Sequence, residues 1–522
     1  MTLAHYFRSL GHFTHVFVAD KFLQDQYLTA FPQDLKIVKG RGNFPCIFPV
    51  SSLDDFFTKR AKKESGTTKL TCAEAPCTEL DDFGCMFKPS VVTDDNGKIY
   101  RNKHGVVRDW DETAPPGCEY WRCKDNAIHN DITIHNYHYF MYEHAYAHEF
   151  TPRYLGIFDE AHLIESLLMG FVEERFASWA FNRITRYLAV PSITIPFYTT
   201  LSDWVSWLDD IHKILTTDIL PRFGDIEAKD IEQTIERKSI LDLVKSTIER
   251  IAKLKVDMSL SPDNWVSYRN ENTITFKPVT IHQYSNKYLF QYTNKRVLMS
   301  ATILDGKALA RYLGLGTDIA FVRVPKSTFP PTNRPFRYDF VGKATYNSMK
   351  EYLPKLLEEL DNRLIPQNLE YKGVIHTHTN DIAKYIVNNS KYKDVMMTNT
   401  FSPLERTEVF EQFFDEKPPK IMVSASMNTG VDLYDDRCRW QVLCKVPYPS
   451  LGDPQIKRRV DQDQTWYVWQ TIMTLVQTYG RGCRSDTDWC NTYMLDSKFA
   501  DVYNRYQYLF PNWFKEAVRI IW

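Results

Sequence analysis

The cysteines of this 522-residue chain are unevenly distributed, and they restrict the fold of its first quarter more than any other feature does. Six of the ten lie between Cys46 and Cys123, and the other four lie between Cys438 and Cys490. From residue 40 to about residue 111 the helical periodicity weakens, and Gly, Pro, Asp, Asn and Cys dominate. We therefore expect this stretch to be an insert that something other than a hydrophobic core holds together.

A dense cysteine cluster in a long chain favours a metal site over the disulfides that a small secreted fold spreads through its structure. The available thiols are Cys46, Cys72, Cys77, Cys85, Cys118 and Cys123. Four thiolates from one loop-rich module suit either a [4Fe–4S] cluster or Zn²⁺. The paired C-x₂-C spacing of common zinc sites is absent. Free buried cysteines are the less favoured alternative.

Outside the insert, short apolar strands alternate with helical patterns, and this alternation predicts parallel sheets in an α/β fold. The expected strands cover residues 15–19, 35–38, 131–137, 154–158, 296–299, 373–377, 420–424 and 440–446. Residues 163 to about 285 are mostly helical in pattern, and a Pro-rich linker covers residues 325–335.

Charge and hydropathy exclude several classes of protein. Lys and Arg total 64 against 65 Asp and Glu, so any nucleic-acid contact must come from local basic patches. The hydrophobic share of 43% and the charged share of 25% exclude a disordered chain, a collagen and a coiled-coil rod. No stretch approaches the ~18 consecutive apolar residues of a membrane helix. The first 19 residues do not resemble a signal peptide, so we expect a cytoplasmic protein, in the host cytoplasm if it is viral.

Two groups of polar residues follow apolar strands. Asp159, Glu160 and His162 come directly after the strand at residues 154–158. Ligands of parallel sheets bind beyond the carboxyl ends of strands, where one carboxylate can hold Mg²⁺ and a neighbour can deprotonate a water. A solvated strand-to-helix turn is the alternative. Residues 300–302 (Ser-Ala-Thr) end another strand, where they either couple a nucleotide site to a partner domain or cap a helix.

Two further stretches lie towards the end of the chain. Gln477, Arg481 and Arg484 have helical spacing, so one helix face would carry an amide and two guanidinium groups that can stabilise a transferring phosphoryl group. A surface helix with salt-bridged arginines is the alternative, although two interrupting glycines make an ordinary helix less expected. Residues 424–432 follow a strand with small polar side chains, which suit either close approach to a phosphate backbone or a plain turn.

In this order and spacing, the pieces resemble the DinG/XPD-like superfamily 2 DNA helicases, and most closely the bacteriophage members. The resemblance spans nearly the whole chain. The matching motifs are Ia at residues 23–27, the DEAH box of motif II at 159–162, III at 300–302, IV at 374–379, V at 424–432 and VI at 477–484. Residues 39–46 and 118–121 are similar to the segments that deliver the first and last cluster cysteines, and residues 131–140 to the strand and turn that follow.

The resemblance implies roles for the matching residues. The catalytic candidates are Asp159, Glu160, His162, Gln477, Arg481 and Arg484. The aspartate would coordinate Mg²⁺, the glutamate would polarise the attacking water, and the two arginines would act as arginine fingers. Gln477 would contact the γ-phosphate of ATP or couple it to DNA.

The resemblance also implies cofactor-binding residues. Candidates in motifs Ia and V are Gln26, Gly430 and Asp432. The cysteine module would hold a [4Fe–4S] cluster, and its ligands would be Cys46, Cys72, Cys77 and Cys118. Cys85 is the rival for the second or third ligand, because the spacing between these cysteines varies in such inserts.

The implied architecture is two RecA-like parallel-sheet motor domains, of which the first is interrupted twice. Its parts would be residues 1–39, 124–165 and 286–325, the last with motif III and a linker. Residues 40–123 would form the Fe–S insert, residues 166–285 a helical arch, and residues 326–522 the second RecA-like domain. The arch and the insert would form the hole through which single-stranded DNA passes. Residues 35–69 carry eight Lys or Arg against three acids, which fits a phosphate-tracking surface or a plain solvated face.

One motif of the family is missing. A helicase motor needs a P-loop, G-x-x-x-x-G-K-S/T, to bind the β- and γ-phosphates. The Gly-Lys pairs of this chain begin at Gly97, Gly306 and Gly342, and none has the flanking residues of a P-loop. Residues 1–7 are similar to the helix that follows the family's P-loop. We favour a truncated, split or mis-started helicase over a nucleotide-blind descendant, because Glu160 and the motif VI arginines are intact.

We therefore expect an ATP-dependent DNA helicase that translocates on single-stranded DNA, with 5′→3′ polarity implied by family. Its partners would be single-stranded and forked DNA, and further candidates are replication or repair proteins and a separately encoded P-loop segment. The 522-residue chain alone should hydrolyse ATP very poorly. The alternatives are a non-catalytic Fe–S protein that binds single-stranded DNA and a zinc-stabilised nucleic-acid-binding module.

Overall fold

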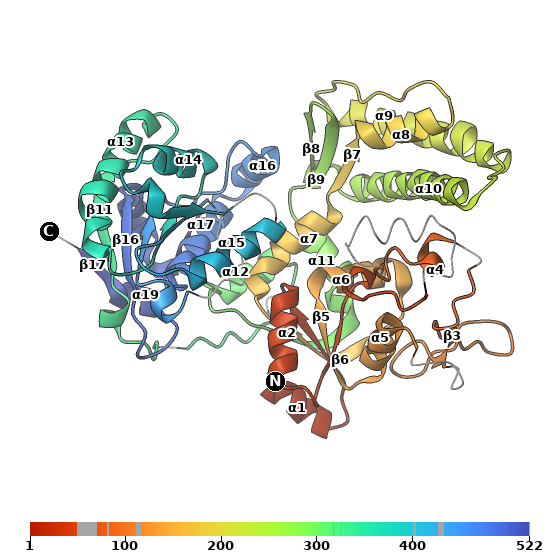
Figure 1. Ribbon diagram of the computed structural model, residues 1–522, viewed down its shortest axis with the longest axis horizontal. Helices are drawn as coiled ribbons and strands as arrows, with labels where there is room; N and C mark the ends of the chain where they lie inside the picture. The colour runs from red at the N-terminus through yellow and green to blue at the C-terminus, as the bar shows by residue number, and fades with distance from the viewer. Residues whose placement is uncertain are drawn as a thin grey trace. The chain divides into compact units, whose positions relative to one another are not determined.

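The computed structural model describes residues 1–49, 70–80, 83–110, 117–316, 318–324, 326–399, 403–425 and 433–520. The chain divides into two compact units, which Figure 1 draws as ribbons. Unit 1 comprises Met1–Ser300, Arg311–Leu315 and Asp453–Arg458. Unit 2 comprises Ala301–Ala310, Gly316–Gly452 and Arg459–Trp522.

Unit 1 is built on a parallel five-stranded sheet with the strand order β10-β6-β1-β5-β2. Its strands are β1 (Thr14–Val18), β2 (Lys36–Val38), β5 (Ile132–Asn136), β6 (Arg153–Phe158) and β10 (Thr293–Leu298). All five residues of β1 are buried. A strand covered on both faces needs a continuous apolar run rather than alternation, which is why the central strands could be recognised in the sequence.

Helices cover both faces of this sheet. The helices of this part are α1 (Thr2–Ser9), α2 (Lys21–Ala30), α5 (Glu119–His129), α6 (Tyr137–Tyr142), α7 (Ile164–Val172) and α11 (His282–Tyr288). Ala4 of α1 packs with Val16, Val18 and Ile157 on one face. On the other face, Phe17 stacks on Phe158 and meets Phe140 of α6 edge to face.

A buried cation ties the amino-terminal ends of these strands to α5. The Arg153 guanidinium is fully buried and has only neutral acceptors within hydrogen-bonding distance, so burial lowers its pKa to about 9. It donates to Thr14 O and Thr133 Oγ1, each at 3.0 Å, and to the carbonyls of Ala127 and Ile128 near the end of α5. These bonds satisfy carbonyl groups at the end of α5, where the Thr133 hydroxyl also donates to Ala127 O at 2.6 Å.

The insert between β2 and α5 contains little regular structure among its described residues. Its elements are α4 (Pro76–Glu79), β3 (Ser90–Val91) and β4 (Arg108–Asp109). Arg108 pairs with Glu149, and Lys124 of α5 lies 2.9 Å from Glu143 and 2.8 Å from Glu149. This buried network of charges attaches the insert to the segment that leads into β6.

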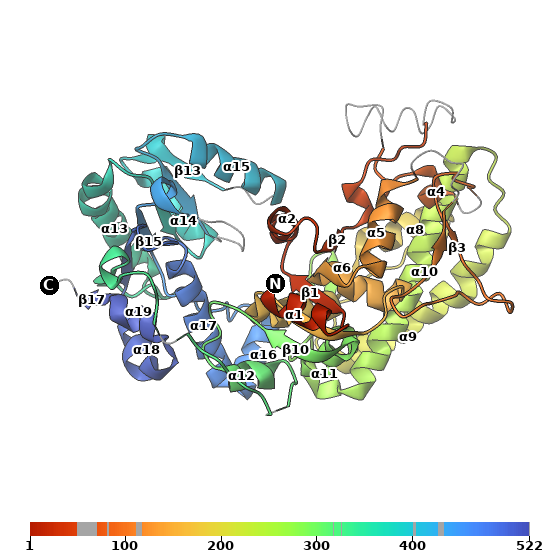
Figure 2. The same cartoon turned by 90° about the horizontal axis from the view of Figure 1, so that it is seen from below.

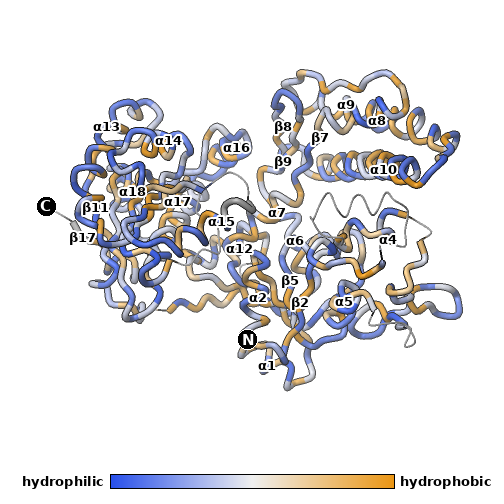
Figure 3. The backbone as a smooth tube through the Cα atoms, viewed as in Figure 1, coloured by the Kyte–Doolittle hydropathy of each residue, from blue (hydrophilic) through white to orange (hydrophobic). Residues whose placement is uncertain are grey.

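The region that we expected to be a helical arch contains a small sheet as well as helices. Its helices are α8 (Ser178–Tyr187), α9 (Leu201–Lys213) and the long α10 (Ile231–Leu260). Three antiparallel strands in the order β7-β9-β8 complete it: β7 (Glu174–Ala177), β8 (Trp265–Asn270) and β9 (Thr273–Pro278). Hydrophobic and hydrophilic residues alternate along α10 in Figure 3. Both ribbon views place α10 beside α4 of the insert (Figure 1 and Figure 2).

Unit 2 holds a parallel seven-stranded sheet with the order β13-β14-β12-β15-β16-β11-β17. Its strands are β11 (Phe336–Gly342), β12 (Gly373–His376), β13 (Met396–Thr398), β14 (Ile421–Ser424), β15 (Trp440–Leu443), β16 (Asn491–Asp496) and β17 (Val518–Ile520). Its helices are α13 (Met349–Glu359), α14 (Asn380–Asn389), α15 (Pro403–Asp415), α17 (Gln464–Tyr479), α18 (Lys498–Tyr506) and α19 (Asn512–Ala517). Helices α12 (Gly306–Tyr312) and α16 (Pro454–Gln462) contribute residues to both units. The predicted α/β fold with parallel sheets is thus confirmed.

Among the described residues, no helix combines the length and the apolar character that crossing a membrane would require.

The fold makes a specific prediction at Gly373. A Cβ atom there would collide with the buried indole of Trp440 on the neighbouring strand. Gly373→Ala should therefore destabilise the protein by about 1–3 kcal/mol, the usual cost of overpacking. Urea denaturation measures this, with Gly170→Ala as the control, because Gly170 is an exposed position of α7 with nothing within 4 Å of its Cβ site. If Gly373→Ala is as stable as the wild type, the described packing of Trp440 against Gly373 is wrong.

Candidate functional site

The carboxyl end of β6 places three polar residues at one edge of the first sheet. Asp159 follows β6 directly, and its N–H donates to Phe17 O at 2.9 Å. Glu160 has a left-handed backbone with φ of 48°, a conformation that costs a non-glycine residue energy and is concentrated at functional sites. The chain then turns, and Ala161 N–H donates to Met299 O at 2.8 Å beyond β10. The turn brings the ends of β6 and β10 together.

The Asp159 carboxylate is held by two hydrogen bonds, one on each oxygen. The Tyr27 hydroxyl donates to Oδ2 at 3.0 Å, and the Glu160 N–H donates to Oδ1 at 3.0 Å. A second tyrosine, the fully buried Tyr137, donates to the Asp159 carbonyl at 2.8 Å. Burial raises the pKa of Asp159, and the hydrogen bond from Tyr27 opposes that rise. The site therefore contains a partly desolvated carboxylate in a fixed orientation.

Glu160, His162 and Ser300 form a connected group beside Asp159. The Ser300 hydroxyl donates to Glu160 Oε2 at 3.1 Å and lies 2.7 Å from His162 Nδ1. His162 Nδ1 is also 3.2 Å from Glu160 Oε2, and its ring is buried. The structure thus brings together residues that lie 140 positions apart, from the stretches at 159–162 and 300–302. A carboxylate oriented in this way can accept a proton from a nearby water.

Helix α2 contributes Tyr27 to this edge, and it also carries Gln26, the candidate cofactor-binding residue. Gln26 is an exposed residue of α2. Its neighbour Gln24 is fully buried, and its side-chain amide donates to Val38 O at 3.0 Å and to Ile134 O at 3.4 Å, which fixes the helix on β2 and β5. Tyr27 was not among the predicted site residues, because a tyrosine on the apolar side of a helix resembles an ordinary core residue in the sequence.

In unit 2, the residues predicted to share one helix face do not do so. Helix α17 ends at Tyr479, so Gln477 lies on the helix while Arg481 and Arg484 lie in the turn beyond it. The expected helical arrangement of the three is therefore wrong. The physical reason lies in the two glycines, since Gly480 caps the helix and a Cβ at Gly482 would collide with Cys490.

That turn is shaped by a buried carboxylate. Asp488 is 1% exposed, accepts the Arg484 N–H at 2.9 Å and lies 2.8 Å from Arg439 Nη1. Arg481 lies near His376 at the carboxyl end of β12, where burial lowers the pKa of His376 to about 3, so that its imidazole is neutral. The stretches at 374–379 and 477–484 thus meet at one edge of the second sheet.

The stretch at 424–432 is described only at its start. Ser424 ends β14, and its carbonyl accepts the Thr377 N–H at 2.9 Å. Gly430 and Asp432, the candidate cofactor-binding residues, lie outside the described residues.

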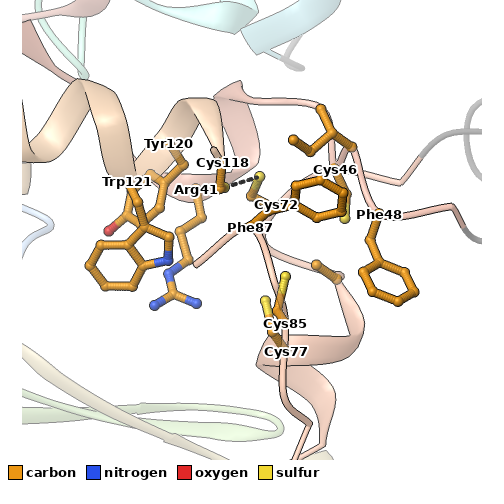
Figure 4. Close-up of a pocket in the computed structure, with 12 residues that line it drawn as sticks. Arg41, Cys46, Phe48, Cys72, Cys77, Cys85, Phe87, Cys118, Tyr120 and Trp121 are labelled. Carbon is orange, nitrogen blue, oxygen red and sulfur yellow. Dashed lines mark hydrogen bonds between the residues drawn. The ribbon is translucent and has the colours of Figure 1, made fainter. Parts of the chain in front are cut away.

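Five of the six clustered cysteines line one small pocket of the insert (Figure 4). They are Cys46, Cys72, Cys77, Cys85 and Cys118. The Sγ atoms of Cys72 and Cys118 lie 3.7 Å apart, and Figure 4 draws the sulfur atoms of Cys77 and Cys85 side by side. Cys123 is not among the residues that line the pocket, and its thiol donates to Ile37 O at 3.2 Å.

The surroundings of the pocket favour thiolates at two positions. A hydrogen bond from Cys85 lowers the pKa of Cys77 to about 6, with help from the nearby Arg41 and Lys88. A hydrogen bond from Cys72 lowers the pKa of Cys118 to about 6, with help from backbone N–H groups at the start of α5. Thiolates are the form of cysteine that binds metals.

The arrangement of the sulfur atoms bears on the kind of metal group. Thiolates on one tetrahedral Zn²⁺ at 2.3 Å lie about 3.8 Å from one another. Across the part of the chain that the structure describes, no three His, Cys, Asp or Glu residues are grouped closely enough to bind a single ion. The pocket of five thiols is also lined by Phe48, Phe87 and Trp121, and the Cys72–Cys118 separation of 3.7 Å is close to the spacing of two thiolates on one Zn²⁺.

The second part of the chain resembles known helicases. Residues 375–517, which begin within β12 and include the turn after α17, match the model of the helicase C-terminal domain family. The Fanconi anemia group J protein homolog of Gallus gallus is 26% identical over 123 residues, which are 21% of this chain and 10% of that protein. The match thus covers about a tenth of the length of that curated relative.

The fold is similar to that of a solved structure titled XPD helicase. The alignment covers 98% of this chain and 92% of that one, with a TM-score of 0.59 and 14% sequence identity. The α/β fold with two parallel sheets is therefore shared along nearly the whole chain, although few residues are.

The buried carboxylate of Asp159 leads to a prediction about pH. A carboxyl group whose folded-state pKa is raised stabilises the fold most below its unfolded value of 3.8 and loses that contribution as the pH rises through the folded value. Asp159→Asn should therefore raise the melting temperature at pH 7, and the gain should shrink towards pH 4. Thermal melts across this range measure it, with Asp210→Asn on the exposed side of α9 as the control. A melting temperature that falls at pH 7 would contradict the assigned environment.

Proposed function

We propose that the chain is an ATP-dependent DNA helicase of the DinG/XPD type, close to the bacteriophage members, that translocates 5′→3′ on single-stranded DNA. The observation that carries this proposal is the group formed by Asp159, Glu160, His162 and Ser300 at the carboxyl edge of a parallel sheet. The match of residues 375–517 to helicase C-terminal domains supports it, because a motor of this kind needs both parts.

In the proposed mechanism, the residues of unit 1 prepare the attacking water. Glu160 accepts its proton, and the Ser300 hydroxyl and the His162 ring hold the Glu160 carboxylate in one orientation. Asp159, fixed by Tyr27, would bind Mg²⁺, which neutralises charge on the phosphates when it is present. In unit 2, Arg481, Arg484 and Gln477 would stabilise the charge of the transferring phosphoryl group.

The proposed path of the DNA uses contacts between the arch and the insert. Ile235 of α10 packs with Cys46, Leu70 and Ala75, and Lys238 Nζ donates to Thr78 O at 3.1 Å. These contacts join α10 to the insert within unit 1. In the proposal, the arch and the insert form the two sides of an opening for single-stranded DNA, and such an opening requires the two to be joined. Forked DNA would place its single-stranded tail there.

A [4Fe–4S] cluster is the cofactor that we propose for the insert. Cys46, Cys72, Cys77 and Cys118 would be its ligands, with Cys85 as the rival. The support is the pocket lined by these five thiols, together with its apolar cover. The cluster would hold together a module that has almost no hydrophobic core of its own.

The 522 residues contain no phosphate-binding loop, and the strand that precedes such a loop could pair with β10. In the strand order of the first sheet β10 is an edge strand, and three of its six residues, 294–296, are exposed. An edge strand offers backbone N–H and C=O groups to a further strand. A parallel strand added there would end beside Ser300 and Asp159, so a loop following it would face them. We propose this as the position of a P-loop strand.

The second candidate function is a non-catalytic Fe–S or zinc protein that binds single-stranded DNA. The observation in its favour is the absence of G-x-x-x-x-G-K-S/T from the sequence. Against it stands the connected group at Glu160, for which a protein without ATP chemistry has no physical need.

Metal analysis tests the cofactor. The anaerobically purified chain should contain about four iron and four sulfide per molecule and show the visible absorption of an iron–sulfur cluster. Elemental analysis and absorption spectroscopy measure this. One zinc ion per chain without sulfide would show that the module is a zinc site instead.

ATP hydrolysis tests the motor. The 522-residue chain alone should hydrolyse ATP very slowly, because the charge-assisted hydrogen bonds of a P-loop, each worth about 1.5–3 kcal/mol, are missing. Joining the strand and P-loop of an XPD helicase to Met1 should create ATPase activity that single-stranded DNA stimulates. In that chimera, Glu160→Gln should lower the rate by about 10²–10⁴-fold.

The matched control is Glu227→Gln, an exposed glutamate of unit 1 for which we expect no effect. A chimera that binds ATP and DNA but gains no hydrolysis would favour the non-catalytic alternative. Robust DNA-stimulated hydrolysis by the 522-residue chain alone would contradict the assigned need for a P-loop.

A further inference from the structure

Helix α8 of the arch carries a tryptophan in the middle of its polar face (Figure 1). The helix buries Phe181, Ile184 and Thr185, and Phe181 meets Trp207 of α9 edge to face. On the opposite side of α8, Trp179 is 63% exposed. A single exposed apolar side chain is common on protein surfaces, so the significance of this indole depends on its neighbours.

Two arginines share the exposed face of α8 with Trp179. Arg183 and Arg186 follow it by four and seven residues, spacings that place side chains on one face of a helix, and both are exposed. At 1.5 Å per residue, their Cα atoms lie about 6 and 10 Å further along the helix axis. With the exposed Asn182 between them, these residues form a continuous surface, which we call the α8 stripe.

Contacts within the arch leave the α8 stripe available to a ligand. Among the described residues, the ring of Trp179 has no aromatic or cationic partner, and neither arginine has a carboxylate within ion-pair distance. Arg183 donates to the Ser239 hydroxyl of α10 at 3.0 Å. Glu236 of α10 lies near Tyr187, at the flank of the stripe, and pairs with neither arginine in the described part of the arch. The stripe therefore presents two positive charges beside an exposed ring.

The position of the α8 stripe relates it to the insert. Ser239, which binds Arg183, is the neighbour of Lys238 in α10, and Lys238 Nζ donates to Thr78 O of the insert at 3.1 Å. Arg183 thus lies close to the contact between the arch and the insert. In the proposed function, these two parts form the sides of an opening for single-stranded DNA.

We propose that the α8 stripe binds single-stranded DNA, with one unpaired base stacked on Trp179 and the adjoining phosphates bound by Arg183 and Arg186. This role rests on the proposed function for the identity of the ligand. A single strand alternates flat bases with phosphates, which matches an indole flanked by guanidinium groups. A duplex keeps its base faces covered by their neighbours, so it cannot stack on Trp179 in this way.

Substitutions in the full 522-residue chain separate the two kinds of contact. Fluorescence anisotropy with a labelled oligothymidylate measures the affinity at several salt concentrations. Trp179→Ala should weaken binding by about 5–100-fold at each of them, because one stacked base is lost, and Trp179→Phe should retain most of the affinity. Arg183→Gln combined with Arg186→Gln should instead lower the slope of log affinity against log salt by about 1.4, as expected for two phosphates of a single strand.

The matched control is Tyr508→Ala, which removes an exposed aromatic side chain of unit 2 and should leave the affinity unchanged. Unchanged affinity in Trp179→Ala would overturn the role of the α8 stripe and leave the proposed function standing. An equal loss of affinity for a fully duplex oligonucleotide would overturn base stacking. A wild-type chain that binds no single-stranded DNA would contradict the proposed function, and the role of the stripe with it.

A second measurement needs no variant and so does not depend on folding of the mutants. An oligothymidylate that carries 5-iodouracil forms a covalent bond on irradiation to an aromatic side chain on which the modified base is stacked. Peptide mass spectrometry should find this bond at Trp179. A bound oligonucleotide that forms cross-links elsewhere but none at Trp179 would overturn the proposal.

Discussion

The hydrogen bond between Tyr27 and Asp159 connects the elements on which the candidate catalytic site depends. Tyr27 lies on α2, whose buried Gln24 is bonded to the backbone near β2 and β5, and Asp159 lies at the end of β6. Four strands of the first sheet therefore help to position the Asp159 carboxylate. They are β2, β5 and β6, together with β10 through its contact with the turn. A shift of α2 would alter the orientation of Asp159 directly. Helix α2, which carries the residues similar to motif Ia, and the end of β6, which carries Asp159, are thus joined within unit 1.

The insert positions its cysteine side chains without the support of a sheet. Its described residues form only short elements, and its small apolar cluster is built around cysteines. Hydrogen bonds between backbone segments and the buried pairs of Arg108 and Lys124 with glutamates position the thiols in place of a core. Because α10 packs on this same cluster through Ile235, loss of a bound metal group would also loosen the contact between arch and insert.

Eight of the twelve described strands of the two parallel sheets could be predicted from the sequence, because buried parallel strands are continuous apolar runs and polar residues such as Asp159 and Ser300 follow them directly. The strands β11, β13, β16 and β17 of the second sheet were not predicted. It did not allow Tyr27 to be predicted, since the contact joins residues 132 positions apart and leaves no local pattern. The end of α17 was missed because the spacing of Gln477, Arg481 and Arg484 fits a helix, whereas Gly480 and Gly482 end it. The strands β7, β8 and β9 were missed because they lie within a stretch whose other residues have a helical pattern. The boundaries of the expected domains and the roles of the site residues stay predictions.

Strand displacement on tailed forks tests the account most directly, because it requires the site at Glu160, the arginines of unit 2 and the proposed DNA opening between arch and insert to work together. The measurement is ATP-dependent unwinding by the chain joined to a P-loop, on forks with either a 5′ or a 3′ single-stranded tail. The account predicts unwinding of the 5′-tailed fork, loss of that unwinding in Glu160→Gln, and little activity on the 3′-tailed fork. Binding of both forks without unwinding of either, although ATP is bound, would contradict it.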